Sequence, residues 1–352
     1  MLSRLGVLFP TTLLLVGLSF VQVPSLQADE PQAELAKGVE LTQLKKIWSQ
    51  GRHNAFTDLV RFHDKWFCAF REGEKHVSAD GSLRILVSSD GEKWESAALV
   101  SMPGLDLRDA KICVTPDDQL MLCGAAVTQP PHEKSHQTYV WFSKDGASWT
   151  QPHAIGDKNY WIWRIVWSDG AAYAVGYQTG VGSRAERTKR GNIRLYKSED
   201  GETFETLVKD LGVRSAPNES SLLFLEDGTA LCVVRRDGEP DATAVLGASK
   251  APYTHWDWKS LGVRVGGPQI LQLPDGQLVV SGRRYLGKAK TALWRLDPAK
   301  SSLQELAVLP SGGDTSYPGL VFHDGQLWVS YYSSHEGKTS IYLAQLILSP
   351  SN

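Results

Sequence analysis

Six tight polar turns recur along this chain at intervals of about 50 residues. Each turn separates two runs that are rich in β-branched, aromatic and small residues, and four of the six contain an Asp-Gly pair. Asp-Gly between such runs is a strong β-hairpin signal, because both central residues of the tightest hairpin turn need a positive φ. The turn aspartates, separated by 54, 51, 58, 48 and 49 residues, are Asp64, Asp118, Asp169, Asp227, Asp275 and Asp324. A repeat of this length that contains only strands predicts a propeller with six blades.

The two ends of the chain are expected to complete one blade together. After the sixth hairpin only one further strand-like run remains, 340–346, whereas the earlier repeats have room for four strands. The segment 38–48 precedes the first hairpin and can supply the missing outer strand, which removes an exposed sheet edge. We therefore predict an all-β fold, a six-bladed β-propeller with N-/C-terminal strand closure, that occupies residues 29–352 as a single domain.

The first 28 residues have the pattern of a secretory signal peptide. Arg4 precedes an apolar run over 5–23, and the small residue Ala28 ends the segment. Pro10 within the run and the polar residues 29–32 after it argue against a stable membrane anchor. The mature chain is accordingly expected to be secreted or periplasmic.

Composition and short motifs exclude several classes of function. The formal net charge is −2, from 37 Lys+Arg against 39 Asp+Glu, so no basic field predicts a nucleic-acid partner. An H-E-x-x-H pattern over 132–136 follows two prolines and precedes a strand-like run, whereas a zinc site of that type needs a helix. We expect no metal and no cofactor. Most of the cysteines, which have irregular spacings, are expected to be buried free thiols: Cys68, Cys113, Cys123 and Cys232.

A second motif, S-x-D-G-x-x-aromatic, occurs three times with a spacing of 55 residues, over 88–94, 143–149 and 198–204. Its Ser and Asp side chains can accept backbone N–H bonds within a turn, and its Gly can adopt a positive φ. The motif resembles the Asp-box of sialidases and related β-propellers, in a form one residue shorter. We expect it to be structural and to lie at the rim of the blades.

Propeller geometry predicts which residues gather at one face. Within a blade, positions seven to nine residues before and after the turn aspartate lie at the ends of the two innermost strands that are remote from the turn. These positions hold Thr57, Arg71, Asp109, Tyr177, Glu219, Arg235, Gly267, Arg283, Tyr317 and Tyr332, with Arg164 slightly closer to its turn. Arginines from three blades suggest a clamp for an anionic group, formed by Arg71, Arg235 and either Arg283 or Arg284. Structural ion pairs between the blades are the alternative explanation.

Two stretches extend the resemblance to sialidases. Residues 218–228 (NESSLLFLEDG), followed by Arg235, resemble the family's N-E…E-L-x-D-G…R stretch, and residues 316–325 (SYPGLVFHDG) are similar to its Y-S-x-L-v…D-G stretch. The resemblance implies that Tyr317 is a nucleophile, that Glu219 is its base and that Arg235 binds a substrate carboxylate. Tyrosine in this role is a departure from the usual pair of glycosidase carboxylates.

The chain also departs from the sialidase pattern. The family's first clamp arginine is absent, since residues 56–59 read Phe-Thr-Asp-Leu, and Arg71 is the expected substitute. Asp80 fits the place of the family's acid/base aspartate, with Asp58 and Asp109 as competitors. Further substrate contacts are expected from Asp109, Arg164 and His335, and His76 is expected near the same mouth.

The resemblance implies an exported exo-glycosidase that hydrolyses a terminal acidic sugar of a glycan or glycoconjugate. Two alternatives stay open, because propellers support many functions. One is a non-catalytic propeller that binds a glycan or a protein. The other is an enzyme that acts on another uronate or a sulfated glycan.

Overall fold

The computed structural model describes residue 2 and residues 32–128, 135–179, 191–238 and 240–349. The expected signal peptide, apart from Leu2, and residues 132–134 of the H-E-x-x-H pattern lie outside the described residues. The chain from Pro31 onward forms one compact unit, to which the following description applies. In the described ranges, no helix is long and apolar enough to cross a membrane.

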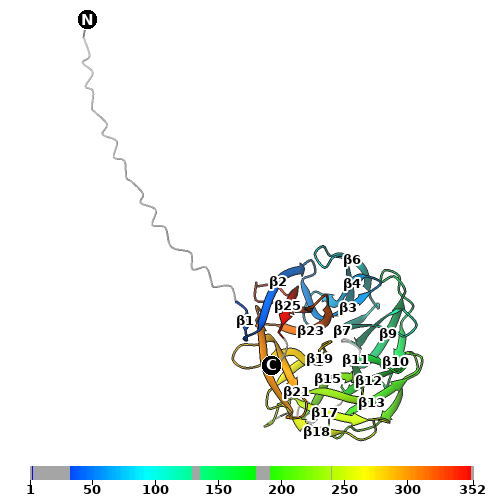
Figure 1. The fold of residues 1–352 in the computed structure, drawn as a ribbon. Coiled ribbons are helices and arrows are strands. Elements are labelled where there is room, and N and C mark those ends of the chain that lie inside the picture. Colours follow the sequence, from blue (N-terminus) through cyan, green and yellow to red (C-terminus); the bar gives the residue numbers. More distant parts are fainter. Residues whose placement is uncertain (1, 3–31, 129–134, 180–190, 239, 350–352) are drawn as a thin grey trace. The chain divides into compact units, whose positions relative to one another are not determined.

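Six antiparallel sheets form a ring, which confirms the predicted six-bladed β-propeller (Figure 1). The first blade contains β3 (His53–Phe62), β4 (Lys65–Gly73), β5 (Ser82–Ser88) and β6 (Glu95–Val100). The second contains β7 (Leu105–Val114), β8 (Leu120–Thr128), β9 (His136–Ser143) and β10 (His153–Ile155). The third contains β11 (Tyr160–Ser168), β12 (Ala171–Gln178), β13 (Ile193–Ser198) and β14 (Glu205–Val208).

The remaining three blades follow the same order from the centre outward. The fourth contains β15 (Pro217–Phe224), β16 (Thr229–Arg236), β17 (Val245–Lys250) and β18 (Asp257–Ser260). The fifth contains β19 (Val265–Gln272), β20 (Leu278–Arg284), β21 (Lys290–Asp297) and β22 (Ser302–Leu309). The sixth contains β23 (Thr315–His323), β24 (Gln326–Ser333), β25 (Ser340–Leu348) and, as its outer strand, β2 (Val39–Trp48).

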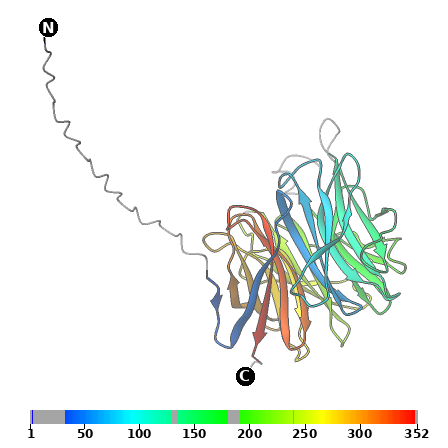
Figure 2. The same ribbon diagram turned by 90° about the horizontal axis from the view of Figure 1, so that it is seen from above.

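The pairing of β2 with β25 confirms the expected strand closure (Figure 2). It runs from Val39 opposite Leu348 to Trp48 opposite Ile341, so the sixth blade is built from both ends of the domain. The short strand β1 (Glu34–Leu35) was not anticipated. It pairs with Val308 and Ala307 of β22 and makes the fifth blade a five-stranded sheet.

Two of the four Asp-Gly turns have a positive φ at both residues, as predicted, whereas in the other two only Gly228 and Gly276 have one. Asp169 and Gly170 have φ values of 49° and 77°, and Asp324 and Gly325 have 48° and 75°. These two-residue turns connect β11 to β12 and β23 to β24, with Ser168 paired to Ala171 in the first case. Positive φ at both central residues gives the turn a twist that matches the twist of the strands.

The S-x-D-G-x-x-aromatic motifs form the turns between the third and fourth strands of the first three blades. In the first of them, the N–H of Gly91 donates to Ser88 Oγ (2.8 Å), and the N–H groups of Glu92 and Lys93 donate to Asp90 Oδ1. The indole of Trp94 donates to the Gly91 carbonyl. The hydrogen bonds to Ser and Asp recur in the other two turns, which is the structural role that the motif predicts.

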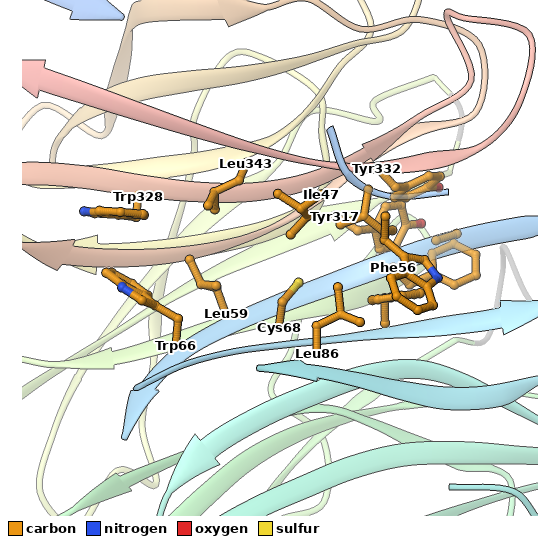
Figure 3. Close-up of a cluster of buried hydrophobic side chains, with 14 of the residues drawn as sticks. Ile47, Phe56, Leu59, Trp66, Cys68, Leu86, Tyr317, Trp328, Tyr332 and Leu343 are labelled. Carbon is orange, nitrogen blue, oxygen red and sulfur yellow. The ribbon is translucent and has the colours of Figure 1, made fainter. Parts of the chain in front are cut away.

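Apolar side chains fill the space between adjacent blades. Between the first and sixth blades, Trp66 stacks on Trp328 with ring centroids 4.2 Å apart, and Leu59, Cys68 and Leu343 continue the layer (Figure 3). Burying one side chain of this size contributes about 1.5–3 kcal/mol. The thiol of Cys68 is free, and so are the other three, as expected.

Candidate active site

A bulge interrupts the innermost strand of every blade close to the end where that strand begins. The register with the second strand shifts between Ala55 and Asp58, Arg108 and Lys111, Ile162 and Ile165, Pro217 and Ser220, Gly266 and Gln269, and Ser316 and Gly319. A bulge frees residues from the ladder and turns their side chains in a new direction. Among the freed residues are Asp109, Glu219 and Tyr317, which all line one cavity.

The bulges hold backbone conformations that side chains rarely adopt. Asp109 has a φ of 55°, Tyr317 of 53° and Phe56 of 64°. Such residues cost of order 1–3 kcal/mol each and cluster at functional sites. Gly267, with a φ of 57°, permits a close approach in addition, because a Cβ atom there would lie 2.8 Å from Cγ of Tyr317.

The cavity has a volume of about 410 Å³ and lies at the face where the inner strands begin. It is lined by side chains or backbone from the first five blades and by Tyr317 of the sixth. A cavity of this size is at the lower end of the range typical of small-molecule sites.

Tyr317, Glu219 and Arg235 form one hydrogen-bonded group in the cavity wall. Tyr317 Oη donates to Glu219 Oε1 at 2.7 Å, within the range expected for a nucleophile and its base. Arg235 Nη1 donates to Glu219 Oε2 (2.7 Å) and to Tyr317 Oη (2.9 Å). The N–H of Gly267 donates to Glu219 Oε2 at 2.8 Å. The three sequence-predicted residues therefore meet, although they come from the fourth and sixth blades.

Aromatic rings and a second carboxylate fix this group in place. The ring of Tyr317 packs edge-on against that of Phe56, with centroids 5.1 Å apart (Figure 3). It packs in the same way against Trp163, at 5.4 Å. The other side of the Arg235 guanidinium contacts Asp237, through Nη2–Oδ2 at 2.9 Å and Nε–Oδ1 at 3.1 Å. Arg235 is thus held by two carboxylates of its own blade.

The phenol of Tyr317 is neutral in this environment. Burial raises the pKa of Tyr317 well above its ordinary value, and the charge of Glu219 raises it further, while Arg235 and Arg283 act in the opposite direction. The side chain therefore keeps its proton at neutral pH and donates it in the hydrogen bond to Glu219. Activation requires transfer of that proton to Glu219 as the new bond forms.

Asp109 offers a second carboxyl group to the same cavity. Its side chain is buried, and Oδ1 has no hydrogen-bond partner among the described residues. Burial raises the pKa of Asp109 to about 6, against the opposing effect of Arg108 and Lys111. A carboxyl group with a pKa near the working pH can both donate and accept a proton.

Two stacked rings form part of the cavity wall. Trp161 and Tyr177 lie opposite each other on β11 and β12, with centroids 5.8 Å apart and planes inclined by 11°. Sequence reasoning found Tyr177 but missed Trp161, although Trp161 lies eight residues before Asp169, within the window that located Glu219 and Tyr317. Flat aromatic surfaces of this kind pack well against the apolar faces of sugars and other rings.

The predicted clamp is only partly formed. Arg235 and Arg283 line the cavity, but Arg71 does not, and this prediction was wrong. The Arg71 side chain is fully buried, where Nε and Nη2 both donate to Oδ1 of Asp106 on β7 and Nη1 donates to the Lys75 carbonyl. It is a structural ion pair between the first two blades.

Arg108, which the sequence indicated only as the neighbour of Asp109, lines the cavity instead. Its guanidinium carbon lies 5.3 Å from the Phe56 ring centroid and 5.9 Å from that of Trp161. Its buried Nε has no hydrogen-bond partner in the part of the chain that the structure describes.

Four other expected site residues lie outside the cavity lining. Arg164 donates from Nη1 to both oxygens of Asp58, and Arg284 Nε pairs with Glu305 at 2.9 Å. Asp80 accepts a hydrogen bond from the Glu74 N–H in the loop before β5. His335 contacts Ser333, two residues away. None of these four residues lines the cavity, although Arg164 Nη2 also donates to the carbonyl of Pro318, next to Tyr317. Of the three aspartates considered for the acid/base role, Asp109 is the one that lines the cavity.

No protein-family model and no curated protein sequence matches this chain. Solved structures do resemble it. A protein of unknown function from Dyadobacter fermentans superimposes with a TM-score of 0.79 at 19% identity, over 89% of this chain and 100% of that one. An alpha-L-arabinanase from Penicillium chrysogenum gives 0.69 at 13% identity, over 86% and 98%. The sialidase of Trypanosoma rangeli gives 0.66 at 13% identity, over 88% of this chain and 60% of that one.

The fold is that of sialidases and arabinanases. The resemblance to the sialidase propeller that the sequence indicated is confirmed at the level of the fold, in a divergent chain. The similar enzymes act on bonds of sugars, and one has a structure described as a covalent intermediate with 2,3-difluorosialic acid.

Proposed function

We propose that this protein is a retaining glycoside hydrolase that removes a terminal acidic sugar, with Tyr317 as nucleophile. The observation that carries the proposal is the Tyr317–Glu219 hydrogen bond of 2.7 Å in the wall of a cavity sized for a small molecule. The glycosidase neighbours support a reaction at a glycosidic bond.

The first step forms a covalent bond between Tyr317 Oη and the anomeric carbon of the sugar. The phenolic proton passes to Glu219 Oε1, to which Oη is already hydrogen-bonded. Asp109, in its protonated form, gives its proton to the leaving glycosidic oxygen as the carbon–oxygen bond breaks. Arg235 and the Gly267 N–H hold Glu219 in position for this transfer.

The second step returns every group to its starting state. The Asp109 carboxylate takes a proton from a water molecule, whose oxygen attacks the anomeric carbon, and the bond to Tyr317 Oη breaks. Glu219 then gives the proton back to Oη. Two inversions at the same carbon result in retention of configuration.

The acidic group of the sugar is assigned to Arg108 and Arg283. Arg108 has a buried Nε at the cavity with no hydrogen-bond partner among the described residues, and Arg283 lies with its guanidinium carbon 5.1 Å from the centroid of the Tyr317 ring. Arginine binds carboxylates and sulfates through planar, paired hydrogen bonds. Arg235 is already engaged by Glu219 and Asp237 and acts on the nucleophile pair instead.

The experiment is hydrolysis of a panel of aryl glycosides of sialic acid, glucuronic acid and arabinofuranose by the purified protein. We expect turnover of an acidic glycoside and its loss in Tyr317→Phe. A fluorinated analogue of the active glycoside is expected to add one sugar mass to the peptide that contains Tyr317.

The matched control is Tyr331→Phe, which removes a buried phenol of the next strand that donates to the Pro310 carbonyl. It is expected to retain activity. Labelling of Glu219 or Asp109 instead of Tyr317 would refute the tyrosine mechanism. Binding of acidic sugars without any turnover would favour the non-catalytic alternative, and preference for the arabinofuranoside would refute the acidic specificity.

A further inference from the structure

Three side chains with metal-binding atoms meet beside the cavity, at the seam between the first and sixth blades. His53 begins β3, His76 lies in the loop between β4 and β5, and Asp314 immediately precedes β23. His53 Nε2 and His76 Nδ1 lie 3.0 and 2.7 Å from Asp314 Oδ2. One ligand atom from each residue lies within 4.8 Å of both others.

We propose that His53, His76 and Asp314 bind one divalent transition-metal ion, for which Zn²⁺ is the probe. Two imidazole nitrogens and one carboxylate oxygen are ligands that Zn²⁺ accepts, and three protein ligands leave a fourth position for water or another small ligand. The motif is absent from the sequence as a local pattern, because its members are separated by 23 and 238 residues.

The three ligand atoms are close enough for side-chain adjustment to bring them to one ion. Zn–N and Zn–O bonds of about 2.0–2.2 Å at tetrahedral angles place ligand atoms about 3.3 Å apart. The separations of 3.0 and 2.7 Å from Asp314 Oδ2 must therefore widen by a few tenths of an ångström, for which the half-exposed His76 side chain has room. The two imidazole nitrogens lie within 4.8 Å of each other, so both rings must also turn toward a common ion. In the metal-free protein both ring nitrogens face the same carboxylate oxygen. To bind the ion, each neutral imidazole presents the lone pair of that nitrogen and carries its N–H on the other ring nitrogen.

The surroundings of the three ligands favour a fixed geometry. Asp314 uses its second oxygen, Oδ1, to accept a hydrogen bond from Tyr332 Oη at 2.8 Å, and Arg283 Nη2 approaches it at 3.5 Å. This leaves Oδ2 directed at the two histidines. The His76 ring packs edge-on against His53 and Phe56, with centroids 5.4 and 5.1 Å away. Such contacts orient ligands and increase metal affinity.

The ion would join the first blade of the propeller to the last. His53 and His76 belong to the first blade, whereas Asp314 leads into the inner strand of the sixth. Both sides of this seam are otherwise connected by hydrogen bonds such as Asn54 Nδ2 to the Thr339 carbonyl. A metal bound across the seam stabilises only the closed ring, so it must raise the resistance of the whole domain to unfolding.

The test is a calorimetric titration of the metal-free protein with Zn²⁺, together with its thermal unfolding in the presence and absence of the metal. We expect one ion per chain and an unfolding temperature that rises by several degrees at saturating Zn²⁺. His76→Ala is expected to weaken binding at least 100-fold and to abolish the rise in temperature. Asp314→Asn is expected to act in the same direction.

The matched control is His63→Ala, which removes another histidine that contacts an aspartate, Asp118, at 2.7 Å but belongs to no cluster of three metal-binding side chains among the described residues. It is expected to leave Zn²⁺ binding unchanged. Because His53 is buried and its replacement can disturb folding, His76, which is half exposed, is the decisive variant. Absence of binding, or equal binding by wild type and His76→Ala, would overturn the proposal. Neither result depends on turnover of a glycoside.

Discussion

The main-chain N–H of Gly267 donates a hydrogen bond of 2.8 Å to Glu219 Oε2, so the fifth blade positions the base of the fourth. The same glycine lies against the ring of Tyr317, which is hydrogen-bonded to Glu219. The candidate nucleophile and its base are therefore both in contact with one residue that has no side chain.

Gly267→Ala is expected to disturb this contact. The added Cβ would meet the Tyr317 ring at 2.8–3.0 Å, in a residue whose φ of 57° already disfavours a side chain. We expect a loss of about 1–3 kcal/mol in the free energy of unfolding, measured with urea, and a fall of at least about 10-fold in kcat. Gly228→Ala is the control, since Gly228 has a φ of 74° but no atom within 4 Å of an added Cβ. Equal activity of the two variants would contradict the prediction.

Tyr317→Phe is expected to reduce kcat by at least about 10³-fold, because it removes the oxygen that attacks the sugar. Glu219 keeps its contacts with Arg235 and Gly267, so the free energy of unfolding should change by only about 1 kcal/mol. Steady-state kinetics and urea unfolding of the same preparation separate these effects. A variant that retains wild-type kcat would rule out Tyr317 as the nucleophile.

Asp109→Asn is expected to change how stability depends on pH. The folded-state pKa of about 6 is above the ordinary 3.8, so the folded protein binds a proton more tightly than the unfolded chain does. The contribution of Asp109 to stability should therefore decrease as the pH rises from about 4 to 6, by about 3 kcal/mol in total. The variant should lack this decrease and be the more stable protein at pH 7. If the free energies of unfolding of both proteins changed with pH in the same way across this range, Asp109 would not be the titrating group.

Arg71→Met is expected to lower stability, whereas Arg108→Lys is expected to weaken substrate binding. Loss of Arg71 removes the cation that faces the buried Asp106 carboxylate and should cost about 3–5 kcal/mol of folding free energy. Arg108→Lys keeps a charge at the cavity but loses the planar guanidinium, so KM should rise about 10-fold or more with little change in stability. If Arg71→Met instead raised KM in a stable protein, the original clamp prediction would be restored.

The sequence predicted the ring and all three residues of the nucleophile group for a simple reason. Turn residues repeat with the blades, and a fixed offset from each turn locates the ends of the inner strands. That offset placed Glu219, Arg235 and Tyr317 correctly at one cavity.

The remaining site residues depend on contacts that no offset describes. Arg71 occupies the predicted position at the end of β4, but Asp106 of the next blade holds its guanidinium inside the protein. Asp80 belongs to a loop whose course is set by its own hydrogen bonds rather than by the sheet. The bulge that directs Asp109 into the cavity has no sequence signal of its own. Residues with the same offset from the turn aspartate can lie inside or outside such a bulge.

The pairing of β2 with β25 has a consequence for how the chain is made. Its partners lie about 300 residues apart, as in the hydrogen bond from Thr42 Oγ1 to the Gln345 carbonyl, and contacts of such long range form slowly. During synthesis, β2 emerges before the four inner and outer strands of any complete blade but has no partner until β25 has left the ribosome. A nascent chain that stops before residue 340 must therefore carry two unpaired strand edges, on β2 and β24, which makes truncated products prone to aggregation.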